Sequence, residues 1–180
     1  MRRAFVLICL AFGAQAAQAQ VDFRSDPDAR ADLALIETCM ADAQSREAAQ
    51  TCVSVTYKLC ISRLDGNVSH TAERGCFLRE LELWNHLYDV EVALTEAWTI
   101  TWEANVRSTG NNRVPAHDIF LKAEAAWRDH MAAQCALEME RWGSGTARIT
   151  SEPQCHMRFV AARLLFFRQS PALRGELSEP

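Results

Sequence analysis

Apolar side chains recur at helical spacing along most of this chain, and the alternation of apolar and polar residues that is typical of β-strands is almost absent. Long segments without glycine or proline separate a few turn signals. The clearest apolar stripe is formed by Leu78, Leu81, Trp84, Leu87 or Tyr88, Leu94 and Trp98. The pattern predicts an all-α protein, a bundle of about five helices.

Capping and turn residues set the expected limits of these helices. Asp26 before Pro27 is typical of a helix start, and Gly143 to Gly145 of a helix end. The expected helices span about residues 26–43, 45–64, 69 or 71–107, 115–142 and 151–166. Further inner positions are expected on the last two: Phe120, Ala123, Trp127 and Met131, then Phe159, Ala162, Leu165 and Phe166.

The first 19 residues have the composition of an export signal. Arg2 and Arg3 precede an apolar run, Ala4 to Gly13, that is too short to cross a bilayer. Ala17-Gln18-Ala19 then supplies the small-x-small pattern of a cleavage site. We therefore expect a signal peptide at 1–19 and a product that is periplasmic or secreted.

The remainder is expected to form one domain, residues 20–170, followed by a flexible C-terminal tail, residues 171–180. No later stretch is long and apolar enough to span a membrane. Removal of the signal takes away two arginines and no acidic residue, so the formal net charge moves from −4 to −6. Such a chain repels phosphate backbones, which argues against nucleic acid and in favour of cationic partners.

Six cysteines follow the signal, and an even number in an exported protein indicates disulfides. Helix geometry favours pairs that flank a turn at similar distances, because the two Cα atoms of a disulfide lie within about 7 Å. The favoured pairs are Cys39 with Cys52, Cys60 with Cys76, and Cys135 with Cys155. Fifteen connectivities are possible for six cysteines. In particular, one continuous helix through residues 39–52 would place that pair about 20 Å apart and prevent the bond.

Several short motifs resemble a known family in their order and spacing. They are Cys76-Phe77-Leu78-Arg79-Glu80-Leu81-Glu82-Leu83-Trp84-Asn85, Ala126-Trp127 with Cys135 eight residues later, the turn Gly143-Ser144-Gly145-Thr146, and Cys155 with Arg163 eight residues later. The chain in this respect resembles the LprI-type lysozyme-inhibitor-like domain of bacterial exported proteins, over roughly Leu35 to Phe167. It departs from that family at Met131 and Ala132, where an arginine–aspartate pair is usual. The resemblance implies a helical fold and, as a function, inhibition of lysozyme or a related cell-wall hydrolase.

The candidate binding surface is the turn between the fourth and fifth expected helices, Arg141, Trp142, Gly143, Ser144, Gly145 and Thr146. A turn held by a Cys135–Cys155 disulfide has less conformational entropy to lose on binding. Of the five tryptophans, Trp142 and Trp102 are expected to be the exposed pair, and the others to fill the core.

Motifs of enzymes and of metal or cofactor sites are missing from the sequence, which has no Gly-x-Ser-x-Gly, P-loop or Cys-x-x-Cys pattern. We therefore expect no catalytic residue, no metal and no cofactor. The predicted function is that of a non-enzymatic module that binds a protein, with a cationic hydrolase such as lysozyme as the partner. The alternative is a periplasmic scaffold or stress protein that binds another envelope protein.

Overall fold

The computed structural model describes residues 25–64, 66, 68–110 and 115–170. The predicted signal peptide, 1–19, and the predicted tail, 171–180, lie outside these residues. Within them the chain forms six α-helices and no strand, which confirms the all-α prediction. The helices are α1 (Pro27–Asp42), α2 (Arg46–Gln50), α3 (Val55–Ser62), α4 (His70–Ser108), α5 (Ala116–Glu140) and α6 (Arg148–Arg168).

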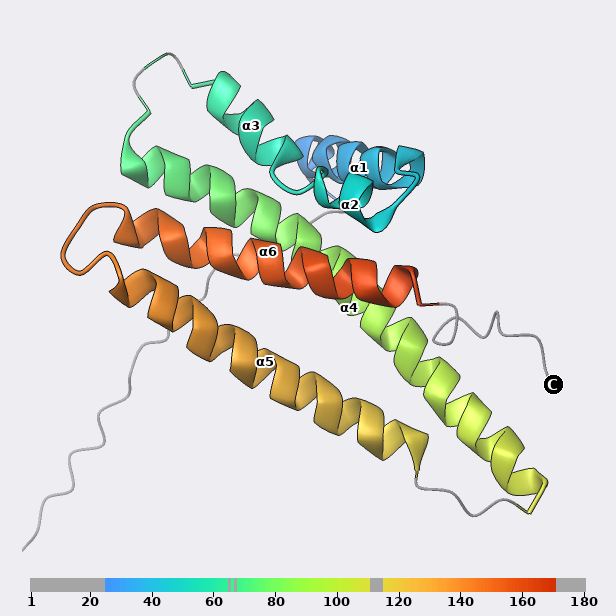
Figure 1. Ribbon diagram of the computed structural model, residues 1–180. Coiled ribbons are helices and arrows are strands. Elements are labelled where there is room, and N and C mark those ends of the chain that lie inside the picture. Colours follow the sequence, from blue (N-terminus) through green and yellow to red (C-terminus); the bar gives the residue numbers. More distant parts are fainter. Residues whose placement is uncertain (1–24, 65, 67, 111–114, 171–180) are drawn as a thin grey trace, which may run out of the picture.

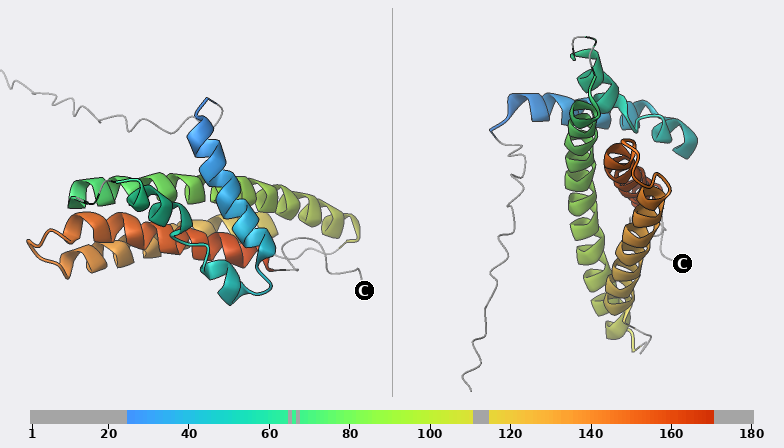
Figure 2. Two further views of the ribbon diagram at one scale, coloured as in Figure 1. Left: turned by 90° about the horizontal axis from the view of Figure 1, so that it is seen from above. Right: turned by 90° about the vertical axis from the view of Figure 1, so that its left-hand side faces the viewer.

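The long helix α4 is the axis of the fold, and α6 packs along it more extensively than any other helix (Figure 1). Helix α5 turns back beside α6, so that α4, α5 and α6 form the long body of the bundle. The three shorter helices lie over one side of this body, and α1 crosses the long helices at a steep angle (Figure 2). The α5–α6 turn is consequently at one end of the bundle, away from the far end of α4.

The helix starts follow from capping residues that are visible in the sequence. The Asp26 side chain accepts the N–H groups of residues 28 and 29, and Pro27 occupies the first helical position, where its missing N–H costs nothing. Ser45 and Ser69 cap α2 and α4 in the same way, through the N–H groups of Ala48 and Ala72. These side chains satisfy donors that have no partner within the helix.

The helix expected at 45–64 is wrong, because the structure divides it into α2 and α3. The break lies at Ser54, whose φ of 79° is in the left-handed region that L-residues rarely adopt. The carboxyl group of Glu80, on α4, accepts the N–H groups of Ser54 and Tyr57 at 2.6 and 2.5 Å. A side chain 26 residues away from Ser54 thus caps the new helix start, and local sequence patterns cannot reveal such a contact.

Helix α6 also begins earlier than expected, at Arg148 instead of 151. Pro153 is therefore inside the helix, at its sixth residue, and not in its first turn. Proline has no N–H to donate to the carbonyl four residues earlier, here that of Ile149. The helix therefore lacks one backbone hydrogen bond in its second turn.

The core forms where α4 and α6 face each other and α1 to α3 close over them. Its fully buried side chains include Ile36, Cys52, Leu83, Trp84, Met157 and Leu164. Four expected inner positions are wrong: Leu94 and Phe166 are 62% and 40% exposed, and Ala123 and Ala162 are exposed as well. Phe167 is buried in place of Phe166, because one residue along a helix turns the side chain by about 100°.

Leu94 is exposed because the covered face of this part of α4 lies elsewhere: the nearby Thr95 and Thr99 are buried instead. The side chain of Arg168, at the end of α6, donates to Glu91 on α4 at 3.2 Å. The part of α4 that follows this contact has no α6 beside it. A regular apolar stripe on a long helix therefore does not mean that the whole stripe is covered.

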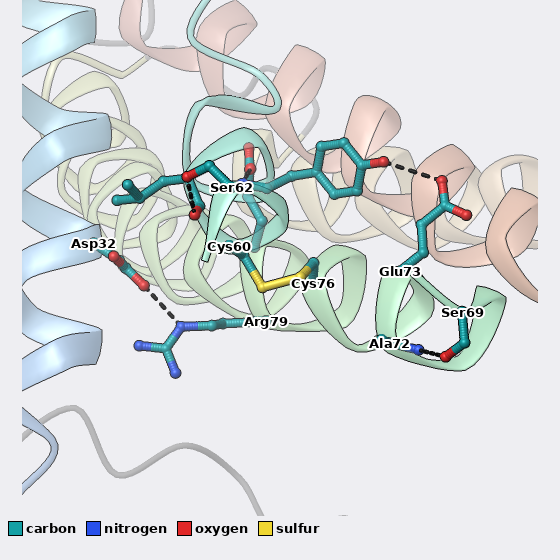
Figure 3. Close-up of a disulfide and its surroundings, with 11 residues drawn as sticks. Asp32, Cys60, Ser62, Ser69, Ala72, Glu73, Cys76 and Arg79 are labelled. Carbon is teal, nitrogen blue, oxygen red and sulfur yellow. Dashed lines mark hydrogen bonds and ion pairs between the residues drawn. A yellow bond between two sulfur atoms is a disulfide. The ribbon is translucent and has the colours of Figure 1, made fainter. Parts of the chain in front are cut away.

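Three disulfides join the helices, and all three are the predicted pairs. Their Cα–Cα distances are 5.8 Å for Cys39–Cys52, 5.6 Å for Cys60–Cys76 and 5.5 Å for Cys135–Cys155, within the usual range. Beside the second disulfide, Arg79 donates to the buried Asp32 of α1 at 2.7 Å (Figure 3). A covalent and an ionic contact thus hold the α1–α3 layer against α4.

Candidate functional site

The six predicted binding residues, 141–146, form the turn between α5 and α6, and all of them are exposed. The turn begins one residue after α5 ends at Glu140. Gly143 has a φ of 52°, in the left-handed region that favours glycine, so it allows the chain to reverse here. The sequence prediction of a turn that presents these side chains to solvent is confirmed.

Backbone hydrogen bonds give this turn a defined shape. The N–H of Gly143 donates to the carbonyl of Glu140 at 3.0 Å, and the N–H of Gly145 donates to that of Trp142 at 2.8 Å. The guanidinium of Arg148, in the first turn of α6, also donates to the carbonyl of Gly143 at 3.2 Å. The Cys135–Cys155 disulfide also joins α5 to α6, the two helices that the turn connects. The turn is therefore preorganised both by its own hydrogen bonds and by this covalent link.

Three arginines surround the turn, and they differ in their partners. Arg148 donates to Glu140 at 2.7 Å, and Arg158 donates to Glu138 at 2.6 Å. Arg141 makes no ion pair or side-chain hydrogen bond with any residue that the structure describes. Its guanidinium therefore keeps all five N–H donors available to a ligand.

Trp142 lies next to Arg141, and 54% of its side chain is exposed. Trp102 is 37% exposed, so the predicted exposed pair is confirmed, whereas Trp84 is fully buried. Tryptophan is highly buried on average, so an exposed indole on an ordered turn is unusual. It offers a flat apolar surface that is already in place for binding.

A groove of about 340 Å³ opens beside the turn, between the end of α5 and the first turns of α6. Trp142 and Arg141 form one part of its wall, and the opposite part comes from α6. The α6 residues in the wall include Thr150, Ser151 and Gln154. The sequence analysis identified the turn but missed this groove, because its far wall depends on how α6 packs against α5.

A second polar cluster is buried in the body of the bundle. The Tyr88 hydroxyl donates to the carboxyl group of Glu124 on α5. Arg163 on α6 donates to the same carboxyl group through two nitrogens, and the bond from its Nε is 3.1 Å long. The Arg163 guanidinium also lies over the ring of Phe167, 4.7 Å from its centroid. Burial raises the pKa of the Tyr88 phenol, and the hydrogen bond to Glu124 raises it further.

This cluster is structural in character. It joins α4, α5 and α6 through one shared carboxyl group, and the groove does not reach it. Removing one member of a buried ionic network leaves its partner's charge uncompensated, which is strongly destabilising. Glu124 carries no signal in the sequence, because its position on α5 resembles that of any solvated acidic residue.

Other kinds of site were sought among the described residues. No group of three or more His, Cys, Asp or Glu side chains there is arranged to hold a metal ion. All six cysteines in the described ranges are in disulfides, so none of these six is available as a thiolate ligand. No helix in the part of the chain described is both long and apolar enough to cross a membrane.

Comparison with known proteins adds no family to this picture. No family model matches the chain, and neither the curated proteins nor the solved structures compared with it include a match. The function must therefore be argued from the geometry of the turn and from the resemblance found in its motifs.

Proposed function

We propose that this protein is an exported, non-enzymatic binding module that inhibits a cationic cell-wall hydrolase of the lysozyme type. The proposal is supported most directly by Arg141, whose guanidinium has no ion-pair partner among the described residues, whereas both neighbouring arginines are neutralised. A cation on an exposed, disulfide-tied turn is suited to binding in an acidic cleft. The alternative function, an envelope scaffold, has no comparable observation in its favour.

The chemistry of the proposed partner matches this turn. Glycoside hydrolases carry two carboxyl groups on either side of the bond that they cleave. The planar fork of an arginine binds a carboxylate through two parallel hydrogen bonds, so Arg141 can pair with one of these groups. The exposed ring of Trp142 would then cover the adjacent part of the cleft, where a sugar ring normally lies.

The overall charge acts at a longer range. The chain without its signal has a formal net charge of −6, which attracts a cationic enzyme during the encounter. At short range, the Arg141 side chain then meets the acidic cleft of an enzyme whose overall charge is positive. Export to the periplasm or outside the cell belongs to the proposal, and the three disulfides support it because such bonds persist in oxidising compartments.

The test is an inhibition assay with lysozyme and labelled cell-wall material, using protein purified in its oxidised form. Saturable inhibition at micromolar protein is expected. Arg141→Glu should weaken it at least about tenfold, as expected when a central contact of an interface is reversed in charge. Arg30→Glu, on the exposed surface of α1, makes the same change in net charge and should have little effect.

Two results would contradict the proposal. The first is an absence of inhibition by protein whose three disulfides have been verified. The second is an equal loss of inhibition in the Arg141 and Arg30 variants, which would assign the effect to net charge and not to the turn. Recovery of one stoichiometric envelope protein from a pull-down, without any hydrolase, would then favour the scaffold.

A further inference from the structure

The groove beside the α5–α6 turn has the size of a small ligand site and a mostly polar wall. Its volume of about 340 Å³ is at the low end of the usual range for ligand pockets. One aromatic side chain, Trp142, accompanies a mixed set of polar groups in its wall. These polar residues are Glu138, Arg141, Thr150, Ser151, Gln154 and Arg158.

The wall carries both hydrogen-bond donors and acceptors. Arg141 supplies only donors, and Glu138 only acceptors, while the amide of Gln154 supplies both. Arg141 and Gln154 have no side-chain partner among the described residues, so their hydrogen-bonding capacity is unused. A ligand that satisfies this wall must itself donate and accept at several closely spaced positions.

Two other classes of ligand fit the groove less well. A phosphate or other anion would meet only one unpaired guanidinium, that of Arg141, in a wall that also carries the carboxyl group of Glu138, because Arg158 is already paired with Glu138 at 2.6 Å. The first N–H groups of α6 are also occupied, since Arg148 and Ile149 donate to carbonyls of the turn. A purely apolar ligand would cover the polar wall without pairing it, which costs free energy.

We propose that this groove binds an oligosaccharide, with one pyranose ring lying against the indole of Trp142. Each sugar hydroxyl both donates and accepts, which matches a wall that carries both kinds of group. The C–H face of the ring is apolar and flat enough to pack on an aromatic side chain. This binding activity goes beyond the proposed inhibition, because it requires no hydrolase.

The experiment is a titration of the isotopically labelled, oxidised protein followed by ¹H–¹⁵N NMR. The protein has five tryptophans, and the indole N–H of each gives its own signal. Trp142→Phe and Trp102→Phe assign two of these signals, and both residues are exposed, so neither substitution opens the core. The probes are tri-N-acetylchitotriose and maltotriose, each raised to about 10 mM to detect the weak affinity of a small site.

A saturable shift of the Trp142 signal, with the Trp102 signal unchanged, is the expected result. Gln154→Ala should weaken the affinity about fivefold, the usual effect of one lost hydrogen bond. A response to the chitotriose alone would assign the groove to acetamido sugars, and a response to both probes to pyranoses in general. The proposal is overturned if neither probe shifts Trp142, or if Trp142 and Trp102 respond alike.

These outcomes are independent of the proposed inhibition. The titration contains no enzyme, so a missing shift would leave the inhibition assay and its Arg141 variant to be judged by themselves. Equally, saccharide binding without any inhibition would retain the groove and reject the hydrolase as partner.

Discussion

The carboxyl group of Glu80 accepts the indole N–H of Trp84 at 2.9 Å, one helical turn along α4, and both side chains are fully buried. The same carboxyl group also accepts the backbone N–H groups of Ser54 and Tyr57. One acidic side chain thus satisfies one buried and two partly buried donors, from two separate parts of the chain. It connects the largest core side chain to the start of α3.

Glu80→Ala should therefore be severely destabilising. One buried and two partly buried donors would lose their partner, and we expect the free energy of unfolding to fall by about 3–5 kcal/mol. Chemical denaturation followed by far-UV circular dichroism measures this loss. Glu37→Ala, an exposed substitution on α1, is the control and should change stability by less than about 0.5 kcal/mol. A Glu80 variant as stable as this control would contradict the capping role.

The Cys135–Cys155 disulfide is expected to contribute both stability and shape. It closes a segment with a sequence separation of 20 residues, so replacing both cysteines by serine should lower the free energy of unfolding by about 3 kcal/mol in the chain-entropy model. Thermal unfolding of the double variant against the oxidised parent gives the value. If the turn acts through its preorganisation, inhibition should also weaken at a temperature where the variant is still folded. Unchanged inhibition there would mean that the turn needs no tether.

Two glycine substitutions should have opposite effects. Gly143 has a positive φ, so Gly143→Ala places an L-side chain in the left-handed region and should cost about 1–2 kcal/mol. Gly75 lies within α4, and an added Cβ there meets no atom within 4 Å. Gly75→Ala should raise stability by about 0.5–1 kcal/mol, because alanine loses less backbone entropy in a helix. Denaturant midpoints of the two variants test both signs, and a stabilising Gly143→Ala would rule out the turn geometry.

Both tyrosines of this protein should titrate late. Burial raises the pKa of Tyr57 and of Tyr88, and hydrogen bonds to Glu73 and Glu124 raise the two values further. The folded protein should consequently show little phenolate absorption near pH 10, where tyrosines in an unfolded chain ionise. Because ionisation is easier in the unfolded state, stability is retained below about pH 10 and falls as the pH rises above it.

A spectrophotometric alkaline titration measures this behaviour. Tyr57→Phe leaves Tyr88 as the remaining tyrosine and so isolates the more strongly shifted phenol. One phenol that ionises near pH 10 while the circular dichroism spectrum is unchanged would contradict the burial of that side chain.

The sequence by itself determined the features that depend on neighbouring residues. Asp26 and Pro27 set the start of α1, because a cap and its helix lie within one turn of each other. The three disulfides were predicted as pairs that flank a turn, since helix geometry brings such positions together. The exposed turn at 141–146 was predicted for the same local reason, from its glycines.

Only the tertiary structure decided the features that depend on distant residues. The break at Ser54 requires Glu80, which is remote in sequence and caps α3 only after α4 has packed against it. Leu94 is exposed whereas Thr95 and Thr99 are buried, because beyond Glu91 the helix α4 packs against α5 and turns another face to its partner. Arg141 has no ion-pair partner among the described residues because Glu140 pairs with Arg148 and Glu138 with Arg158. The groove forms only where α5 packs against α6. Helix propensity and capping act over a few residues, whereas pairing and burial are set by three-dimensional contacts, which the linear pattern does not contain.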